Sequence, residues 1–333
     1  MKNESHPTTT TESETGPRAI GILCLLIIFL ALDAAAQKPP QPPTTTRPTG
    51  ESRGPQATAT ASLHVAPVEM SSPTRSWAPP NIDDAVPPVA PSVACVLPEV
   101  LQGADKRVKE LVANLEQFTA TERIEHAEVD GAANWHRPVA RSFHYLVSIS
   151  EVRPGMLNVE ETRDGNSALD NFPTKLATTG LAAFALVFHA YYVGDFEMAC
   201  EGLGEWHGQP AWQVHFQQRP DKPARMHVFR IGGGLYPVKL KGRAWISADA
   251  YQVVRLELDL MEPIPKIRLQ VEHLDIEYRP VQFAQRHLEL WLPESADLYM
   301  DFRGGRYHHR HSFSDFLLFS VDATQQIQAP PQP

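Results

Sequence analysis

The stretch Lys239-Leu-Lys-Gly-Arg-Ala-Trp-Ile-Ser-Ala-Asp-Ala-Tyr-Gln-Val-Val-Arg-Leu-Glu-Leu-Asp-Leu260 alternates between apolar and polar residues on both sides of a short polar segment. This pattern is typical of two antiparallel β-strands joined by a turn. A shift by one residue would bring apolar side chains opposite charged ones, so the pattern predicts one register and a sheet with one covered face. With the loop Ser247–Tyr251, the predicted pairs are Ile246 with Gln252, Leu240 with Leu258, Val238 with Leu260, Lys241 with Glu257, Lys239 with Asp259 and Arg243 with Arg255.

The beginning of the chain has the pattern of an export signal. Residues 1–36 contain Arg18, then the apolar run Ala19–Leu32, and they end in small residues, which indicates a signal peptide cleaved after Ala36. An uncleaved N-terminal anchor is the alternative, because acidic residues precede Arg18, although the run is shorter than the roughly 20 residues of a membrane span. We expect an extracytoplasmic protein, periplasmic or secreted, that lies near a membrane through this segment.

Two further segments have the composition of disordered chain. Residues 37–94 are rich in proline, threonine, serine and alanine, so they cannot bury enough apolar surface to offset the entropy of ordering. We predict a disordered linker there, either a spacer or an unselected low-complexity tail. Residues 324–333 form a second disordered tail, which leaves one folded domain at 95–323.

The domain at 95–323 reads as helices followed by many strands. A helix is predicted from Pro98 to Leu115, and a second, almost wholly apolar helix from about Thr178 to Phe188. The predicted fold class is mainly β with α (α+β), an antiparallel half-open β-barrel of about eleven strands covered by one or two helices. The predicted strands are 118–124, 141–149, 156–162, 196–200, 211–217, 225–231, 238–246, 251–260, 266–278, 286–292, 297–302 and 309–321.

Cysteine usage and charge restrict the compartment and the partners. Once the signal is removed, Cys95 and Cys200 remain, and in an exported protein we predict that they form a disulfide. Two buried free thiols or a reactive pair are the alternatives. The net charge is −9 and the sequence has no basic block, so nucleic acid is not an expected partner.

The sequence contains no recognisable catalytic or metal-binding motif. A Gly-x-Ser-x-Gly elbow and a His-Glu-x-x-His sequence are both missing, and Gly232–Gly234 precedes a strand instead of the helix that a phosphate loop requires. The histidines at 308–311 are interleaved with Arg306 and Arg310, which favours a polar exposed strand over a metal site. We therefore expect a protein that is not an enzyme and has no cofactor.

The order of the elements resembles a known family. A helix, a short meander, an apolar helix and a long run of strands carry Gly242-Arg-Ala-Trp-Ile-Ser-Ala-Asp249 and Val253-Val-Arg-Leu-Glu257. In these features the chain resembles the periplasmic lipoprotein-carrier superfamily (LolA and LolB type, including outer-membrane lipoprotein-sorting proteins) over about Pro98–Val321. The resemblance implies a half-open barrel whose apolar concavity binds lipid acyl chains without catalysis. The Pro-rich tether, the cysteine pair and the larger size depart from the dedicated carriers, and no ligand-contacting residue is transferred.

Taken together, the sequence predicts an exported, non-enzymatic protein that binds a lipid or a lipoprotein acyl group in an apolar barrel cavity. One alternative is an envelope scaffold or sensor that binds a protein partner through the same sheet. Another is an unrecognised hydrolase with a cleft where a histidine and an acid converge. The predicted cavity residues are Phe184, Val187 and Phe188 as a lid and Leu240, Leu256 and Leu258 as a floor.

Overall fold

The computed structural model describes residues 76–115, 117–130, 132, 134–153, 156–163, 180–231 and 233–319. By their contacts the residues divide into two units, Met1–Pro67 and Val68–Pro333, and all described residues belong to the second. The predicted signal peptide, residues 37–75 of the predicted linker and the predicted tail lie outside the described residues.

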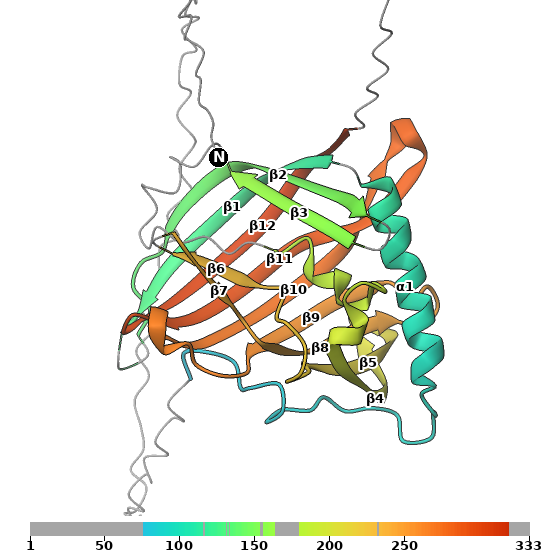
Figure 1. The fold of residues 1–333 in the computed structure, drawn as a ribbon, viewed down its shortest axis with the longest axis horizontal. Coiled ribbons are helices and arrows are strands. Elements are labelled where there is room, and N and C mark those ends of the chain that lie inside the picture. The colour runs from blue at the N-terminus through green and yellow to red at the C-terminus, as the bar shows by residue number, and fades with distance from the viewer. Residues whose placement is uncertain are drawn as a thin grey trace, which may run out of the picture. The chain divides into compact units, whose positions relative to one another are not determined.

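The described residues form a ten-stranded antiparallel sheet and a separate two-stranded ribbon (Figure 1). The strand order is β3-β2-β1-β12-β11-β10-β9-β8-β5-β4, so β3 and β4 are the two edges of a curved sheet that does not close on itself. The predicted class, mainly β with α and an open antiparallel barrel, is confirmed. The strands are β1 Gln117–Val129, β2 Val139–Arg153, β3 Met156–Arg163, β4 Phe196–Trp206, β5 Gln209–Gln218, β6 Val228–Ile231, β7 Gly234–Pro237, β8 Leu240–Ser247, β9 Val253–Leu260, β10 Leu269–Phe283, β11 Leu288–Phe302 and β12 Gly305–Phe319.

Two details of the strand prediction are wrong. The predicted strands 286–292 and 297–302 are one strand, β11, which continues through Pro293. A bulge at Glu294, beside this proline, lets the pairing with β10 continue although proline has no N–H to donate. The ribbon of β6 and β7 pairs only with itself among the described strands, so it does not extend the sheet.

Helices cover the inner face of the sheet. α1 (Leu97–Asn114) begins with a proline in its first turn, as predicted, and buries Val100, Ala104, Val108 and Leu111 along one face. The predicted second helix is much shorter than expected: its described part is the 3-10 helix η2 (Phe184–Phe188), and Thr178 lies outside the described residues. Gly180 has a φ of +92°, which no right-handed helix passes through. The other 3-10 helices are η3 Val193–Asp195, η4 Pro265–Ile267 and η5 Ala284–Arg286.

The central hairpin forms, but its register differs from the prediction by two residues. The turn closes between Ser247 and Gln252, so the loop has four residues instead of five, which shifts the register by one residue. A bulge at Val254 shifts it by one more. A shift by two keeps the paired side chains on their predicted faces. The observed register also pairs Arg243 with Glu257, in place of the unfavourable predicted pair of Arg243 with Arg255. The observed pairs include Leu240 with Leu260, Lys241 with Asp259, Arg243 with Glu257 and Trp245 with Arg255.

A proline-rich segment covers part of the outer face of the sheet. We call residues 76–94 the outer strap; they precede α1 and are drawn in blue in Figure 1. The Ile82 N–H donates to Asp259 Oδ2 at 2.8 Å, and Arg243 Nη1 donates to the Ile82 carbonyl at 2.8 Å. Arg243 is fully buried beneath the strap, so the prediction of a single covered face is wrong at β8. The strap falls within residues 37–94, which the sequence assigns to the linker.

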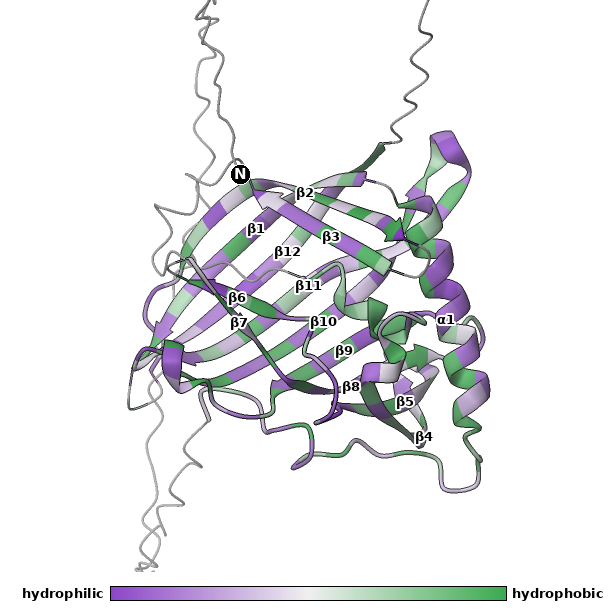
Figure 2. Ribbon diagram, viewed as in Figure 1, coloured by the Kyte–Doolittle hydropathy of each residue, from purple (hydrophilic) through white to green (hydrophobic). Residues whose placement is uncertain are grey.

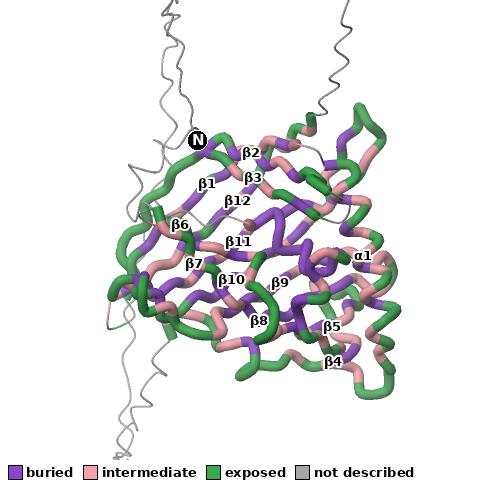
Figure 3. The backbone as a smooth tube through the Cα atoms, viewed as in Figure 1, coloured by how far each residue is buried: buried purple, intermediate pink, exposed green. Residues whose placement is uncertain are grey.

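The main core lies between the inner face of the sheet and its helical cover. Apolar and polar residues alternate along the strands in Figure 2, and Figure 3 shows buried chain concentrated at the centre of the sheet and in η2. Gly242 belongs to this packing, because a Cβ there would lie 2.4 Å from Cζ of Phe216 on β5. Among the described residues, no helix has the length and apolar character that crossing a membrane requires.

Candidate functional site

The candidate site is the inner face of the sheet together with its cover. All six predicted cavity residues are buried and belong to one apolar cluster, so the structure brings the predicted lid and floor into one core. Phe188 of the lid meets Phe216 of β5 edge-to-face, with ring centroids 6.2 Å apart. The six residues are Phe184, Val187 and Phe188 on η2, Leu240 on β8, and Leu256 and Leu258 on β9.

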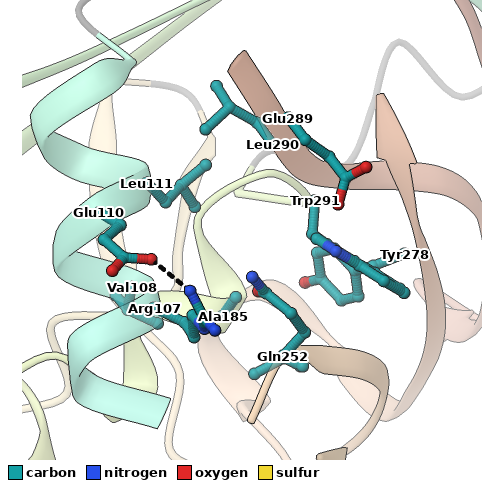
Figure 4. A pocket seen from close by; sticks show the side chains of 11 residues that line it. Arg107, Val108, Glu110, Leu111, Ala185, Gln252, Tyr278, Glu289, Leu290 and Trp291 are labelled. Atoms are coloured by element: carbon teal, nitrogen blue, oxygen red, sulfur yellow. Dashed lines mark hydrogen bonds and ion pairs between the residues drawn. The ribbon is translucent and has the colours of Figure 1, made fainter. Parts of the chain in front are cut away.

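A small pocket lies at the seam between the cover and the wall. Its volume is about 40 Å³, close to the space of one water molecule. Figure 4 shows Arg107 and Leu111 reaching it from α1, and Trp291 bounding it from β11. Arg107 Nε donates to the carbonyl of Ala250 at 2.7 Å, which ties α1 to the β8–β9 turn. None of the six predicted cavity residues lines this pocket, so their role as ligand contacts stays a prediction.

Tyr278 connects the wall to the cover at the same seam. Its hydroxyl lies 3.4 Å from the carbonyl oxygen of Leu181, at the start of the buried apolar segment. Burial raises the pKa of Tyr278, so the hydroxyl stays protonated and acts as a donor. Both polar and apolar side chains therefore line the seam.

At the β1 and β12 side, the inner face becomes polar and charged. Glu122 on β1 and Arg163 on β3 form a fully buried ion pair, with Arg163 Nη2 2.8 Å from Glu122 Oε1. His311 Nδ1 donates to the same carboxylate oxygen at 2.8 Å, since a carboxylate accepts and does not donate. His126 Nδ1 and His309 Nε2 lie 2.8 Å apart. An apolar ligand tail is therefore favoured against the β8–β10 side of the inner face and disfavoured here.

Burial and charge control the protonation of this polar region. Burial by itself raises the pKa of Glu122, but the charge of Arg163 and the hydrogen bonds from His311 and Arg163 outweigh it, and the pKa falls from 4.5 to about 2. Burial, followed by the neighbouring histidines, holds the pKa of His309 well below its usual 6.5. Burial also raises the pKa of Glu161, whose carboxylate accepts from the Tyr145 hydroxyl at 2.7 Å and from the Gly180 N–H at 2.8 Å.

His309 is expected to make the fold acid-sensitive. Its pKa is lower in the folded than in the unfolded chain, so its contribution to stability is complete above about pH 6.5 and is lost as the pH falls below that value. We expect the wild type to lose stability between pH 7 and pH 5 relative to His309→Gln, measured by urea unfolding at several pH values. His136→Gln, at an exposed histidine, is the control and should follow the wild type. Parallel curves for wild type and His309→Gln would contradict this assignment.

Sequence reasoning missed most of the seam and misjudged the histidines. His309 and His311 are buried, with exposed fractions of 1% and 0%, so the prediction of an exposed polar strand is wrong. They face inward because they alternate with Arg310 on β12, a signal that the charge-based argument did not use. Arg107 and Gln252 carried no sequence signal for a pocket. Within the described ranges no group of three or more His, Cys, Asp or Glu residues is arranged to hold a metal ion.

Comparison with known proteins gives structural matches alone. No protein-family model matches the chain, and no curated protein matches it in sequence. The fold is similar to that of a DUF1329 family protein from Desulfovibrio piger, with 10% identity over 66% of this chain and 92% of that chain and a TM-score of 0.38. Two further similar structures are lipoprotein LppX from Mycobacterium tuberculosis (10% identity, 66% and 95% of the chains, TM-score 0.24) and a putative outer membrane lipoprotein-sorting protein domain from Vibrio parahaemolyticus (9% identity, 66% and 94%, TM-score 0.35).

Proposed function

We propose that this chain is an exported, non-enzymatic binding protein for an amphipathic lipid or a lipoprotein acyl group, whose tail takes the place of η2 on the inner face of the sheet. One observation carries the proposal. The eight consecutive residues Leu181–Phe188 are all apolar and all buried, yet they form a turn and a short 3-10 helix instead of an α-helix. A 3-10 helix has poorer hydrogen-bond geometry, so its burial depends on apolar contact that an acyl chain can also make.

The seam pocket between described residues is too small for an acyl chain, so the proposal requires that the cover moves. A pocket of about 40 Å³ is far below the roughly 300–1,000 Å³ of ordinary ligand pockets. α1 is held at both ends, by the Cys95–Cys200 disulfide just before it and by β1, which begins at Gln117 just after it. The element that leaves is therefore η2, and α1 stays as a fixed wall.

The free energy of binding follows from an exchange of apolar contacts. Each buried methylene contributes about 0.8 kcal/mol, so about ten methylenes contribute about 8 kcal/mol before costs. Displacing η2 offsets part of this gain, because the side chains of Phe184 and Phe188 lose their burial. Longer acyl chains are therefore expected to bind more tightly.

The disulfide supports the exported location. Cys95 and Cys200 are bonded, with Cα atoms 6.1 Å apart, and such bonds persist in oxidising compartments outside the cytoplasm. The predicted signal at residues 1–36 supports the same location and lies outside the described residues. Membrane proximity through that segment stays part of the proposal.

Adjacent valines allow a matched test of lipid binding. Val253 lines the seam pocket on the inner face, and Val254, at the bulge, packs with Trp245 on the outer face; their exposed fractions are 5% and 8%. We expect Val253→Phe to fill the pocket and weaken binding of a fluorescent fatty acid about tenfold, a loss of about 1.4 kcal/mol. Val254→Phe should leave binding unchanged. Overpacking is expected to cost both variants about 1–3 kcal/mol of stability, measured by urea unfolding, so stability alone would not separate them.

Native mass spectrometry of the purified full chain provides the second measurement. We expect a co-purified lipid mass on the wild type and on Val254→Phe, and its loss from Val253→Phe. Phe188→Asp should keep the lipid, because a carboxylate buried at this position disfavours the closed state in which η2 covers the inner face. A wild type that stays empty and takes up no fatty acid would refute the proposal.

An exposed apolar rim favours a second candidate, a scaffold that binds a protein partner. Val152 and Met156 at the β2–β3 turn are 60% and 42% exposed, and Leu317 and Phe319 at the end of β12 are 59% and 45% exposed. Phe319 pairs with Gln117, which also pairs with Ser148, so both groups lie toward the same end of the sheet. If the fatty-acid test fails, cross-linking at Leu317 in envelope membranes would test this candidate.

A further inference from the structure

The outer strap borders a cavity that is partly open to solvent and plays no part in the proposed lipid site. The cavity lies on the opposite face of the sheet from η2, between residues 79–87 of the strap and the outer faces of β9 and β10. Its volume is about 300 Å³, space for about ten non-hydrogen atoms at about 30 Å³ each. Pro80, Ile82 and Val86 give it an apolar wall.

The strap is firmly held where it borders this cavity. Asp83 forms an ion pair with Lys241 and lies 3.1 Å from His215 Nε2, in addition to the two hydrogen bonds of the Ile82 backbone. Further along, the Ala90 N–H donates to the carbonyl of Leu203 at 2.8 Å. The cavity is therefore bounded by an anchored segment.

Two polar side chains, Glu257 and His273, line the cavity. His273 is 3% exposed, and its Nδ1 lies 2.9 Å from Asp259 Oδ1. Because a carboxylate only accepts, Nδ1 of His273 is the donor in this contact. Glu257 contributes a carboxylate, one oxygen of which accepts from Arg255.

The charge balance at the cavity is negative. The Arg255 guanidinium bonds both oxygens of Asp275, at 2.8 and 2.7 Å, as well as Glu257, so one positive charge serves two carboxylates. Arg243 is occupied by Glu201 and by the Ile82 carbonyl. An entering cation meets the Glu257 carboxylate, a net negative charge and an aliphatic wall, whereas an anion meets repulsion.

We infer that the strap cavity binds a primary alkylammonium group, with its N–H donors on the Glu257 carboxylate and its alkyl part against Ile82 and the prolines. A primary ammonium has three donors and no acceptor, which matches a lining that presents acceptors. The group belongs to a free amine or to the head group of an aminolipid. The inference does not depend on the proposed lipid function, because the two sites lie on opposite faces.

Hexylamine is the probe, titrated into the full chain at pH 7 by calorimetry, with hexanol as the uncharged counterpart. We expect hexylamine to bind and hexanol to bind at least about tenfold more weakly. Glu257→Gln should weaken hexylamine binding about tenfold. Glu277→Gln is the matched control, since Glu277 lies on β10 outside the cavity lining, and it should bind like the wild type.

A second variant tests the cavity in case Glu257→Gln does not fold. Ala85 is exposed and lines the cavity, so Ala85→Phe should block hexylamine without disturbing the core. Val253→Phe should leave hexylamine binding unchanged, which separates this site from the lipid site. Preference for phosphatidylethanolamine over phosphatidylcholine vesicles, competed by hexylamine, would assign an aminolipid, and no vesicle binding would assign a free amine. Equal binding of hexylamine and hexanol, or of hexylamine to Glu257→Gln and wild type, would overturn the inference.

Discussion

Replacing Arg163 with alanine is expected to lower the free energy of unfolding by about 3–5 kcal/mol, because it leaves the Glu122 carboxylate buried without its cation. The side chain of Glu122 is 0% exposed and that of Arg163 is 3% exposed. In the wild type the neighbouring charge keeps the pKa of Glu122 near 2, against an ordinary 4.5. This shift by itself corresponds to about 3 kcal/mol of stability above pH 4.5, lost as the pH falls toward 2, which agrees with the expected cost.

Urea unfolding at pH 7 measures the effect, and an exposed pair provides the control. Arg123 and Glu125 form an ion pair on the same strand as Glu122, with side chains 49% and 34% exposed. Arg123→Ala should change stability by less than about 1 kcal/mol, because water already solvates both charges. The double variant Glu122→Gln with Arg163→Met removes both charges and should recover most of the loss. Equal effects of Arg163→Ala and Arg123→Ala would contradict the assignment of a buried pair.

The central hairpin illustrates how far hydrophobic pattern determines structure. Its alternation predicts two strands and, beyond the bulge at Val254, the correct faces, and both are found. It does not predict the register, because a shift by two residues preserves every face and so leaves the pattern unchanged. The shift arises from the shorter turn and from the bulge at Val254, which depend on backbone conformation; Tyr251, for example, has a φ of +56°. The alternating pattern predicts neither the shorter turn nor the bulge.

The outer strap illustrates where composition misleads. Its proline content is typical of disordered linkers, and the sequence places it there. What holds it is a small set of contacts with residues far away in sequence: Ile82 is 177 residues from Asp259, its partner at Oδ2, and 161 residues from Arg243. Such pairings have no local signature. The strap cavity, which depends on them, is for the same reason invisible in the sequence.

The apolar site was predictable in part. Uniform apolar composition from Leu181 to Phe188 indicates burial whatever the backbone conformation, and all eight residues are buried. The length of the helix was not predictable, because an all-apolar segment has no periodicity that distinguishes a helix from a turn. The polar part of the inner face was missed for a related reason: Glu122 and Arg163 are 41 residues apart, and each separately looks like a solvated charge.

Loss of the Cys95–Cys200 bond is the second change with a large expected effect. The bond closes a loop with a sequence separation of 105 and joins the residue near the start of α1 to β4, the edge strand of the sheet. In the chain-entropy treatment a loop of this length restricts the unfolded chain by about 4–5 kcal/mol. We expect Cys95→Ser with Cys200→Ser to lower the free energy of unfolding by about 3–5 kcal/mol, measured by urea unfolding under oxidising conditions.

Three comparisons separate the loss of the cross-link from the loss of a side chain. Each single serine variant should lose as much as the double variant, because one bond is absent in all three. Reductant should destabilise the wild type by the same amount and leave the double variant unchanged. The denaturant slope should rise when the bond is absent, since an unfolded chain without the cross-link exposes more surface. If the losses of stability in the two single variants add up to the loss in the double variant, packing of the two side chains is responsible. If, in addition, reductant does not destabilise the wild type, the bond does not hold the start of α1 to the sheet.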